Sequence, residues 1–189
     1  MALSLQSPEA KGQTAMTDAV KAPPVPGEIA VPAGNKPYAI GNAVGTQNYV
    51  CLPTGWTFLG PQATLFVTVP WFKGEMVQQI MTHYLSSNPA EAGMARPTWQ
   101  SSLDTSRIWG KAKASSMDPN FVAAGAIPWL LVEIVGMQDG PMGGSLLSQT
   151  TFLQRVKTTG GVAPTKACSV GAVELVPYTA DYVFYRAAR

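Results

Sequence analysis

The sequence predicts an all-β domain, a mostly antiparallel β-sandwich or barrel of about nine to eleven short strands with minimal helix. Three observations lead to this fold class. Glycine and proline are frequent, at 18 and 16 of 189 residues, and supply turns. No stretch keeps a 3.6-residue apolar period through three helical turns. Short apolar or alternating runs recur between turn signals, as expected of many strands.

Residues 1–27 are rich in proline and alanine and end in KAPPVPG. The spacing of Pro23, Pro24 and Pro26 predicts an extended, polyproline-like arm. We expect this arm either to be disordered or to dock on a neighbouring molecule, which makes it a candidate contact in an oligomer. Residues 28–189 then form a single β domain, long enough to bury a substantial core.

Candidate strands follow one another through this domain. They are Pro37–Ile40, Gln47–Leu52, Trp56–Leu59, Ala63–Val69, Met76–Tyr84, Thr98–Ser101, Arg107–Ala114, Ile127–Val135, Thr151–Lys157, Ala172–Val176 and Tyr178–Arg186. The turn signals that separate them are Gly41, Gly55, Lys73–Gly74, Asp139–Pro141, Gly143–Gly144 and Gly160–Gly161.

Helix is expected in only one or two turns, at Glu75–His83 or at Asp118–Ala124. The first segment is ambiguous, because Met76 and Ile80 fit one face of a helix together with His83. Ser86–Arg96 is the least strand-like interior stretch. We expect it to be a loop, and loops placed over a rigid sheet often carry function.

Charged residues interrupt otherwise apolar strands. Ile127–Val135 is apolar on both faces, which predicts a central strand covered on each side. Within it, Glu133 either reaches solvent near the strand end, which we favour, or is buried beside a cation such as Arg155. Arg155 and Lys157 are two residues apart and so share a strand face. They form either an anion-binding patch or, as we favour, ion pairs with Asp181.

Composition excludes two classes of partner. Charged residues make up 13% of the chain and the net charge is +2 without a basic stripe, which argues against a nucleic-acid partner. No uncharged apolar run reaches the length of a membrane span. The N-terminal MALSLQSPEAKG does not read as a signal peptide. We expect an exported protein whose signal has been removed, with a cytosolic location as the alternative.

The two cysteines, Cys51 and Cys168, are too far apart in sequence for a CxxC motif. Cys51 shares a strand face with Gln47 and Tyr49 and should lie beneath a sheet. The cysteines are either buried free thiols or partners in one disulfide, which would contribute about 4–5 kcal/mol in the chain-entropy model. We favour the disulfide, which fits an exported protein.

Common catalytic motifs are absent from the sequence. His83 is the single histidine, and a mixed site with Asp104 or Glu91 would lack the three or four protein ligands that transition metals usually need. There is no GxSxG elbow and no GxGxxG fingerprint. We therefore expect no metal site and no cofactor.

The remaining polar and aromatic candidates suggest a pocket. His83, Asp104 and Arg155 are the candidate acid–base residues. The candidate ligand-binding residues are Tyr49, Tyr84, Trp99, Gln154 and Tyr182. The preferred function is an exported module that binds a small apolar or aromatic ligand, or a surface polymer, in an aromatic-lined cleft. The alternative is a cofactor-independent isomerase, cyclase or hydrolase that uses His83 with Arg155 or Asp104.

Four stretches are similar to a known family: GTQNYVC (45–51), THY followed by RPTWQ (82–84 and 96–100), AIPWLLVEIVG (126–136) and FLQRVKTTGGVAP…C…VPYTADYVFYR (152–186). Over about residues 30–186 the chain resembles the DUF3455 family, exported bacterial and fungal proteins of uncharacterised function. The resemblance implies an exported domain with both cysteines in the positions of the family, and it implies no reaction. The segment SSNPAEAGMAR (86–96) is longer than the HYAGP-like turn of typical members.

Overall fold

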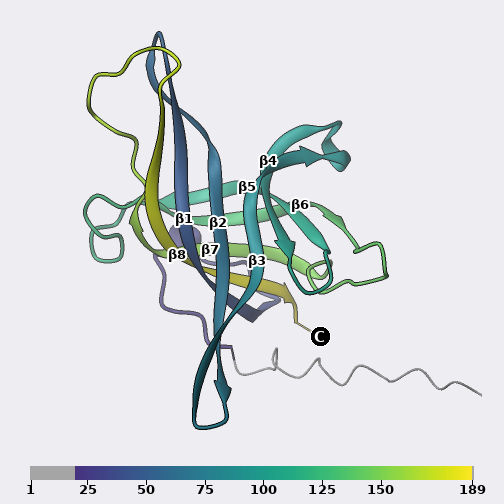
Figure 1. Cartoon of the computed structure of the whole chain (residues 1–189). Helices are drawn as coiled ribbons and strands as arrows, with labels where there is room; N and C mark the ends of the chain where they lie inside the picture. The colour runs from purple at the N-terminus through teal and green to yellow at the C-terminus, as the bar shows by residue number, and fades with distance from the viewer. Residues whose placement is uncertain (1–19, 189) are drawn as a thin grey trace, which may run out of the picture.

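A computed structural model describes residues 20–188 and contains a closed antiparallel barrel of eight strands in sequence order, β1 to β8. Each strand pairs with the next, and β8 pairs with β1 to close the barrel (Figure 1). The predicted all-β class is confirmed. The strands are β1 Asn35–Leu52, β2 Gly55–Trp71, β3 Gly74–Asn88, β4 Met94–Ser101, β5 Arg107–Ser116, β6 Trp129–Gln138, β7 Thr150–Gly160 and β8 Val173–Ala187.

The predicted number of nine to eleven short strands was wrong, because pairs of predicted strands merge. β1 contains the predicted strands 37–40 and 47–52, and β2 contains 56–59 and 63–69. β8 contains 178–186 and all but the first residue of 172–176. Gly41 was interpreted as a turn but lies inside β1. A Cβ at this position would come within 2.9 Å of Leu65 Cδ2, so the glycine permits close packing of strands.

Helix is short, as predicted, but at other positions. In the described part of the chain it consists of two 3₁₀ turns, η1 at Gly27–Ile29 and η2 at Pro89–Glu91. Glu75–His83 lies in β3, so the helical alternative there was wrong, and residues 118–124 form turns. The expected loop at 86–96 is instead a hairpin, because β3 and β4 continue to both sides of η2.

Apolar side chains that alternate with outward-facing ones along each strand occupy much of the barrel interior. Its fully buried members include Leu65, Met81, Ile108, Leu153 and Phe184. An eight-stranded barrel has an interior that side chains either fill or leave open for one small ligand.

Residues 20–34, the N-terminal strap, cover the outer face of the barrel. Ile29 is fully buried there in a second apolar cluster with residues of β6, β7 and β8. Gln154 of β7 donates from Nε2 to the Ile29 carbonyl at 2.7 Å and accepts from the Tyr185 hydroxyl at 2.6 Å. Part of the predicted arm therefore packs on the same chain, whereas residues 1–19 of it lie outside the described residues. An oligomer through the arm stays a prediction.

Strand β6 is covered on both faces, as predicted. Trp129 and Leu131 pack into the outer cluster, and Val132 packs into the barrel interior. Glu133 is half-exposed and pairs with Lys113, with Nζ and Oε1 3.1 Å apart. The solvent-reaching alternative for Glu133 is therefore correct, and Arg155 is not its partner.

The lengths of the strand pairings differ greatly around the barrel. β1 and β8 pair from Asn35 to Val50 of β1. In contrast, β4 pairs with β5 only over Thr98–Gln100, and β6 pairs with β7 only over Leu130–Glu133. The β5–β6 hairpin is thus joined to the rest of the barrel by only two short stretches of strand pairing.

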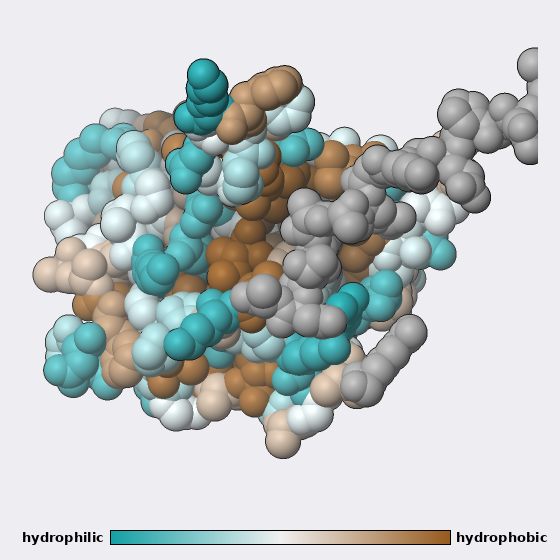
Figure 2. Space-filling view, turned by 90° about the horizontal axis from the view of Figure 1, so that it is seen from below, coloured by the Kyte–Doolittle hydropathy of each residue, from teal (hydrophilic) through white to brown (hydrophobic). Residues whose placement is uncertain are grey.

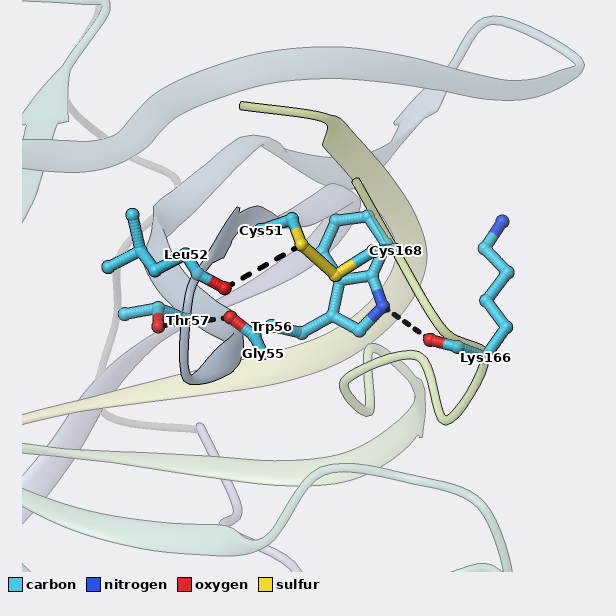
Figure 3. Close-up of a disulfide and its surroundings, with 7 residues drawn as sticks. All are labelled: Cys51, Leu52, Gly55, Trp56, Thr57, Lys166 and Cys168. Carbon is cyan, nitrogen blue, oxygen red and sulfur yellow. Dashed lines mark hydrogen bonds between the residues drawn. A yellow bond between two sulfur atoms is a disulfide. The ribbon is translucent and has the colours of Figure 1, made fainter. Parts of the chain in front are cut away.

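The disulfide is present and joins Cys51 at the end of β1 to Cys168 in the loop before β8, with their Cα atoms 6.0 Å apart. The backbone of Cys51 also exchanges hydrogen bonds with Ala172 and Gly171. The Trp56 indole lies beside the disulfide and donates from Nε1 to the Lys166 carbonyl at 3.0 Å (Figure 3). This arrangement ties the β1–β2 turn to the 161–172 loop, at the top of Figure 1.

At the opposite end, the β2–β3 hairpin extends away from the barrel (Figure 1). Its tip exposes two aromatic side chains, Trp71 at 55% and Phe72 at 94%. Seen from below, apolar residues form a strip across the middle of the molecule, bordered by hydrophilic residues (Figure 2). No helix within residues 20–188 has the length and hydropathy needed to cross a membrane.

Candidate ligand cavity

A cavity of about 300 Å³ lies inside the barrel, and every strand contributes to its lining. This volume is at the lower end of the range for small-molecule sites, roughly 300–1,000 Å³. Its apolar wall consists of Phe58, Pro61, Pro97, Ala112, Ile127, Leu130 and Val132. Its polar and aromatic lining residues are Gln47, Tyr49, His83, Trp99, Arg155 and Tyr182. The structure therefore brings five of the predicted site residues together: Tyr49, His83, Trp99, Arg155 and Tyr182.

Three of these side chains form an aromatic trio, which consists of His83, Trp99 and Tyr182. His83 and Trp99 are opposite each other on β3 and β4, and their rings stack with centroids 4.2 Å apart and planes 11° apart. The Tyr182 ring from β8 meets both rings edge-on, at 5.2 Å from His83 and 5.5 Å from Trp99. Edge and stacked contacts of this kind fix the ring positions, so the trio is a rigid wall.

His83 is neutral in this environment. Its Nδ1 lies 2.9 Å from the Thr98 carbonyl oxygen, which can only accept a hydrogen bond, so we infer that Nδ1 carries the hydrogen and Nε2 the lone pair. Burial lowers the pKa of His83 to about 3. At neutral pH the ring therefore donates a hydrogen bond from Nδ1 and can accept one at Nε2, and it carries no ionisable proton that it could give to a ligand.

Arg155 is held by a backbone carbonyl and not by a carboxylate. Its Nε and Nη2 donate to the Pro128 oxygen at 3.2 and 2.9 Å. None of the ion pairs among residues 20–188 includes Arg155. The guanidinium also acts on the Tyr182 hydroxyl through a hydrogen bond, which lowers the pKa of Tyr182 against the larger effect of burial. Because an arginine has five N–H groups, those not directed at Pro128 or Tyr182 remain for another acceptor.

The predicted pairing with Asp181 holds for only one of the two cations. Lys157 Nζ lies 3.0 Å from Asp181 Oδ2, whereas Arg155 is opposite Tyr182. The register of β7 on β8 is irregular between Val156 and Thr159, and Lys157 has a positive φ of 49°. This bulge breaks the two-residue alternation on which the shared face was predicted.

The charge of Arg155 reaches several lining groups. Burial raises the pKa of Tyr49 and of Tyr182, and the guanidinium offsets part of that rise. Burial is also the main cause of the lowered pKa of His83, and Arg155 lowers it further. The cavity wall is thus neutral apart from one cation.

Two buried donors at the cavity have no hydrogen-bond partner, Gln47 Nε2 and Trp99 Nε1. Both side chains are almost fully buried, at 3% and 2% exposure. The Tyr178 hydroxyl lies near Gln47, but Nε2 does not reach it with hydrogen-bond geometry. A buried unpaired donor costs about 1–3 kcal/mol. Both atoms are inaccessible in this structure, so an acceptor in the cavity could bind them only after a small shift of these side chains.

The other predicted site residues lie elsewhere. Tyr84 follows His83 on β3, donates to Gln100 Oε1 at 2.6 Å, and lines an open outer groove between β1, β2 and β3. Gln154 lies on the outside and binds the strap. Asp104 lies in the β4–β5 turn, where it accepts from Leu146 N at 2.8 Å and from Ser106. Burial tends to raise the pKa of Asp104, but these hydrogen bonds together lower it.

Sequence reasoning missed Gln47, Phe58 and Pro128 as lining residues. Gln47 had a usable signal, because it shares a strand face with Tyr49 and Cys51. The Pro128 carbonyl had none, since a backbone oxygen leaves no mark in the sequence. Among residues 20–188 there is no cluster of three or more His, Cys, Asp or Glu side chains that could hold a metal ion.

Comparison with known families gives one match. The family model described as a protein of unknown function, DUF3455, covers residues 32–186. The chain belongs to the DUF3455 family. The match spans all eight strands and both cysteines of this DUF3455 protein. Searches of the curated proteins and of the solved structures found no match.

Proposed function

We propose that this protein is a non-catalytic binding module that takes a small apolar or aromatic molecule into the barrel cavity. The observation that carries the proposal is a single cavity lined by the aromatic trio and by Arg155, a cation without an anionic partner among residues 20–188. A partly open site of about 300 Å³ suits a molecule of one or two rings. The surface-polymer version of the hypothesis stays a prediction.

The enzymatic alternative has weaker support. His83 has a pKa of about 3 and so offers no proton to a substrate at neutral pH. Asp104 is engaged in the β4–β5 turn, away from the cavity lining. Catalysis by His83 with Arg155 stays a prediction.

We also propose that the protein works outside the reducing cytosol. The Cys51–Cys168 disulfide supports this, because such bonds persist mainly in oxidising compartments. Rapid alkylation of thiols in intact host cells, followed by mass spectrometry, tests it. The expected result is unmodified Cys51 and Cys168 without reductant, and alkylation of both in the native host would contradict an oxidising location.

Binding is tested by titrating the ¹⁵N-labelled protein with naphthalene-2-carboxamide and 2-naphthoate. We expect a saturable shift of the Trp99 indole N–H signal, which is identified by its loss in Trp99→Phe. The Trp129 indole provides an internal control. Its Nε1 is also buried and unpaired, but it lies in the outer cluster and should not move. No saturable shift at Trp99 with either compound, or equal shifts at Trp129, would refute the proposed site.

A further inference from the structure

We propose that the cavity selects an organic anion, an aromatic carboxylate whose ring packs on the aromatic trio and whose carboxylate meets Arg155. This inference rests on the proposed function, because it names the class of ligand for the same cavity.

The first step is the charge of Arg155. Arg155 is the one charged side chain among the lining residues, and the lining contains no Asp or Glu. Its guanidinium is oriented by the Pro128 carbonyl, which satisfies hydrogen bonds without neutralising the charge. A partly buried cation with no anionic partner favours a negatively charged ligand group, because the low local dielectric strengthens their attraction.

The second step is the hydrogen-bonding character of the wall. The unpaired atoms Gln47 Nε2 and Trp99 Nε1 are both donors, as are the N–H groups of Arg155 that bind neither Pro128 nor Tyr182. A carboxylate is acceptor-only and has several lone-pair directions, so it can satisfy more than one of these donors at once. A ligand cation or a donor-rich ligand would leave them unpaired.

The third step is the apolar part of the ligand. The stacked His83 and Trp99 rings and the edge-on Tyr182 form a preformed aromatic wall. The remaining wall is aliphatic or proline, including Leu130 and Val132. Such a wall buries an aromatic ring favourably and offers few other polar partners. A planar ring would pack on the aromatic and aliphatic wall, and a single carboxylate on that ring would meet Arg155.

The test compares 2-naphthoate with naphthalene-2-carboxamide by isothermal titration calorimetry. The two compounds have the same shape, and the amide lacks the charge. We expect the wild-type protein to bind the carboxylate about tenfold or more tightly than the amide. Arg155→Met should remove this preference and retain amide binding, whereas Arg155→Lys should keep part of it. Equal affinity of the wild type for both compounds would overturn the inference and leave the proposed function standing.

The salt dependence of the wild-type protein gives a second readout that does not depend on the folding of a variant. Raising the NaCl concentration should weaken 2-naphthoate binding and leave amide binding nearly constant. The same insensitivity for both compounds would again overturn the inference. Failure of both compounds to bind at any salt concentration would instead refute the proposed function itself.

Discussion

Burial of the His83 ring makes the stability of the barrel depend on pH. Its pKa falls from an ordinary 6.5 to about 3 in the folded protein, because the buried ring is poorly solvated. The unfolded chain therefore binds a proton below pH 6.5 that the folded chain does not bind until near pH 3. The stabilisation is complete above pH 6.5 and is lost as the pH falls below it, by up to about 1.4 kcal/mol per pH unit.

Urea unfolding of the wild type and of His83→Gln between pH 7 and 5 measures this effect. The free energy of unfolding should fall more steeply with decreasing pH in the wild type than in the variant. Glu91, whose pKa is lowered to about 2 by hydrogen bonds from Arg96 and Asn88, contributes equally in the two proteins and so cancels in the comparison. Parallel pH profiles for the two proteins would show that His83 is not buried in its neutral form.

Gly45 in β1 is required by the close approach of β2. A Cβ at residue 45 would lie 2.2 Å from the Gln62 carbonyl oxygen and 2.5 Å from Ala63 Cα. Both neighbours are backbone atoms, which cannot move aside without shifting a strand. We expect Gly45→Ala to destabilise the fold by about 1–3 kcal/mol or more in urea unfolding.

Gly74→Ala is the matched control for this substitution, because no atom lies within 4 Å of a Cβ built at that residue. Its effect should be within about 1 kcal/mol of zero. Equal stability of the two alanine variants would show that β1 and β2 are further apart at Gly45 than in this structure.

The alternation of side chains along a strand explains which site residues were predictable. His83 and Arg155 face the cavity, so their neighbours Tyr84 and Gln154 must face outward, a separation that the sequence already implied. Asp104 was not excluded in this way, because the course of the β4–β5 turn is set by its hydrogen bonds to residues about forty positions later.

At the scale of elements, the N-terminal strap acts as an external cover for β6, β7 and β8. Ile29 is its buried anchor and has no exposed surface. Ile29→Ala should cost about 2–5 kcal/mol of unfolding free energy, because it leaves a cavity beneath a segment that is fixed on both sides. Val44→Ala, at a side chain that is 58% exposed, should change stability by about 0.5 kcal/mol or less.

Thermal unfolding of the two variants compares these positions directly. If Ile29→Ala were as stable as Val44→Ala, the strap would not be packed on the barrel in solution.

The ends of the strands were predicted less well than their existence. The strand class was recognisable from short apolar runs, but Gly41 was taken as a turn inside the single strand β1, and β8 was divided into the predicted strands 172–176 and 178–186. A glycine in a strand that approaches a neighbour closely has the same sequence signature as a glycine in a turn. Only the pairing partner distinguishes them, and β1 pairs with residues more than 120 positions away.

At the scale of the whole molecule, the disulfide closes a loop of 117 residues that contains most of the barrel. Removing it should cost about 2–5 kcal/mol, mainly by freeing the unfolded chain. The wild type should unfold at lower urea concentration when reductant is present. A double variant with Cys51→Ser and Cys168→Ser should unfold at the same urea concentration as the reduced wild type, and adding reductant should not change its stability. Equal stability of the oxidised and fully reduced wild type would contradict this role.

The short β4–β5 and β6–β7 pairings should make the β5–β6 hairpin the most mobile part of the barrel. This hairpin is paired to β4 only over Thr98–Gln100 and to β7 only over Leu130–Glu133, yet it carries part of the cavity wall. Because few backbone hydrogen bonds join this hairpin to its neighbours, we expect it to separate from the barrel more readily than the other strands. Its opening would let a ligand enter the cavity. In deuterated water its amide protons should exchange sooner than those of β1 and β8, and occupation of the cavity should slow them.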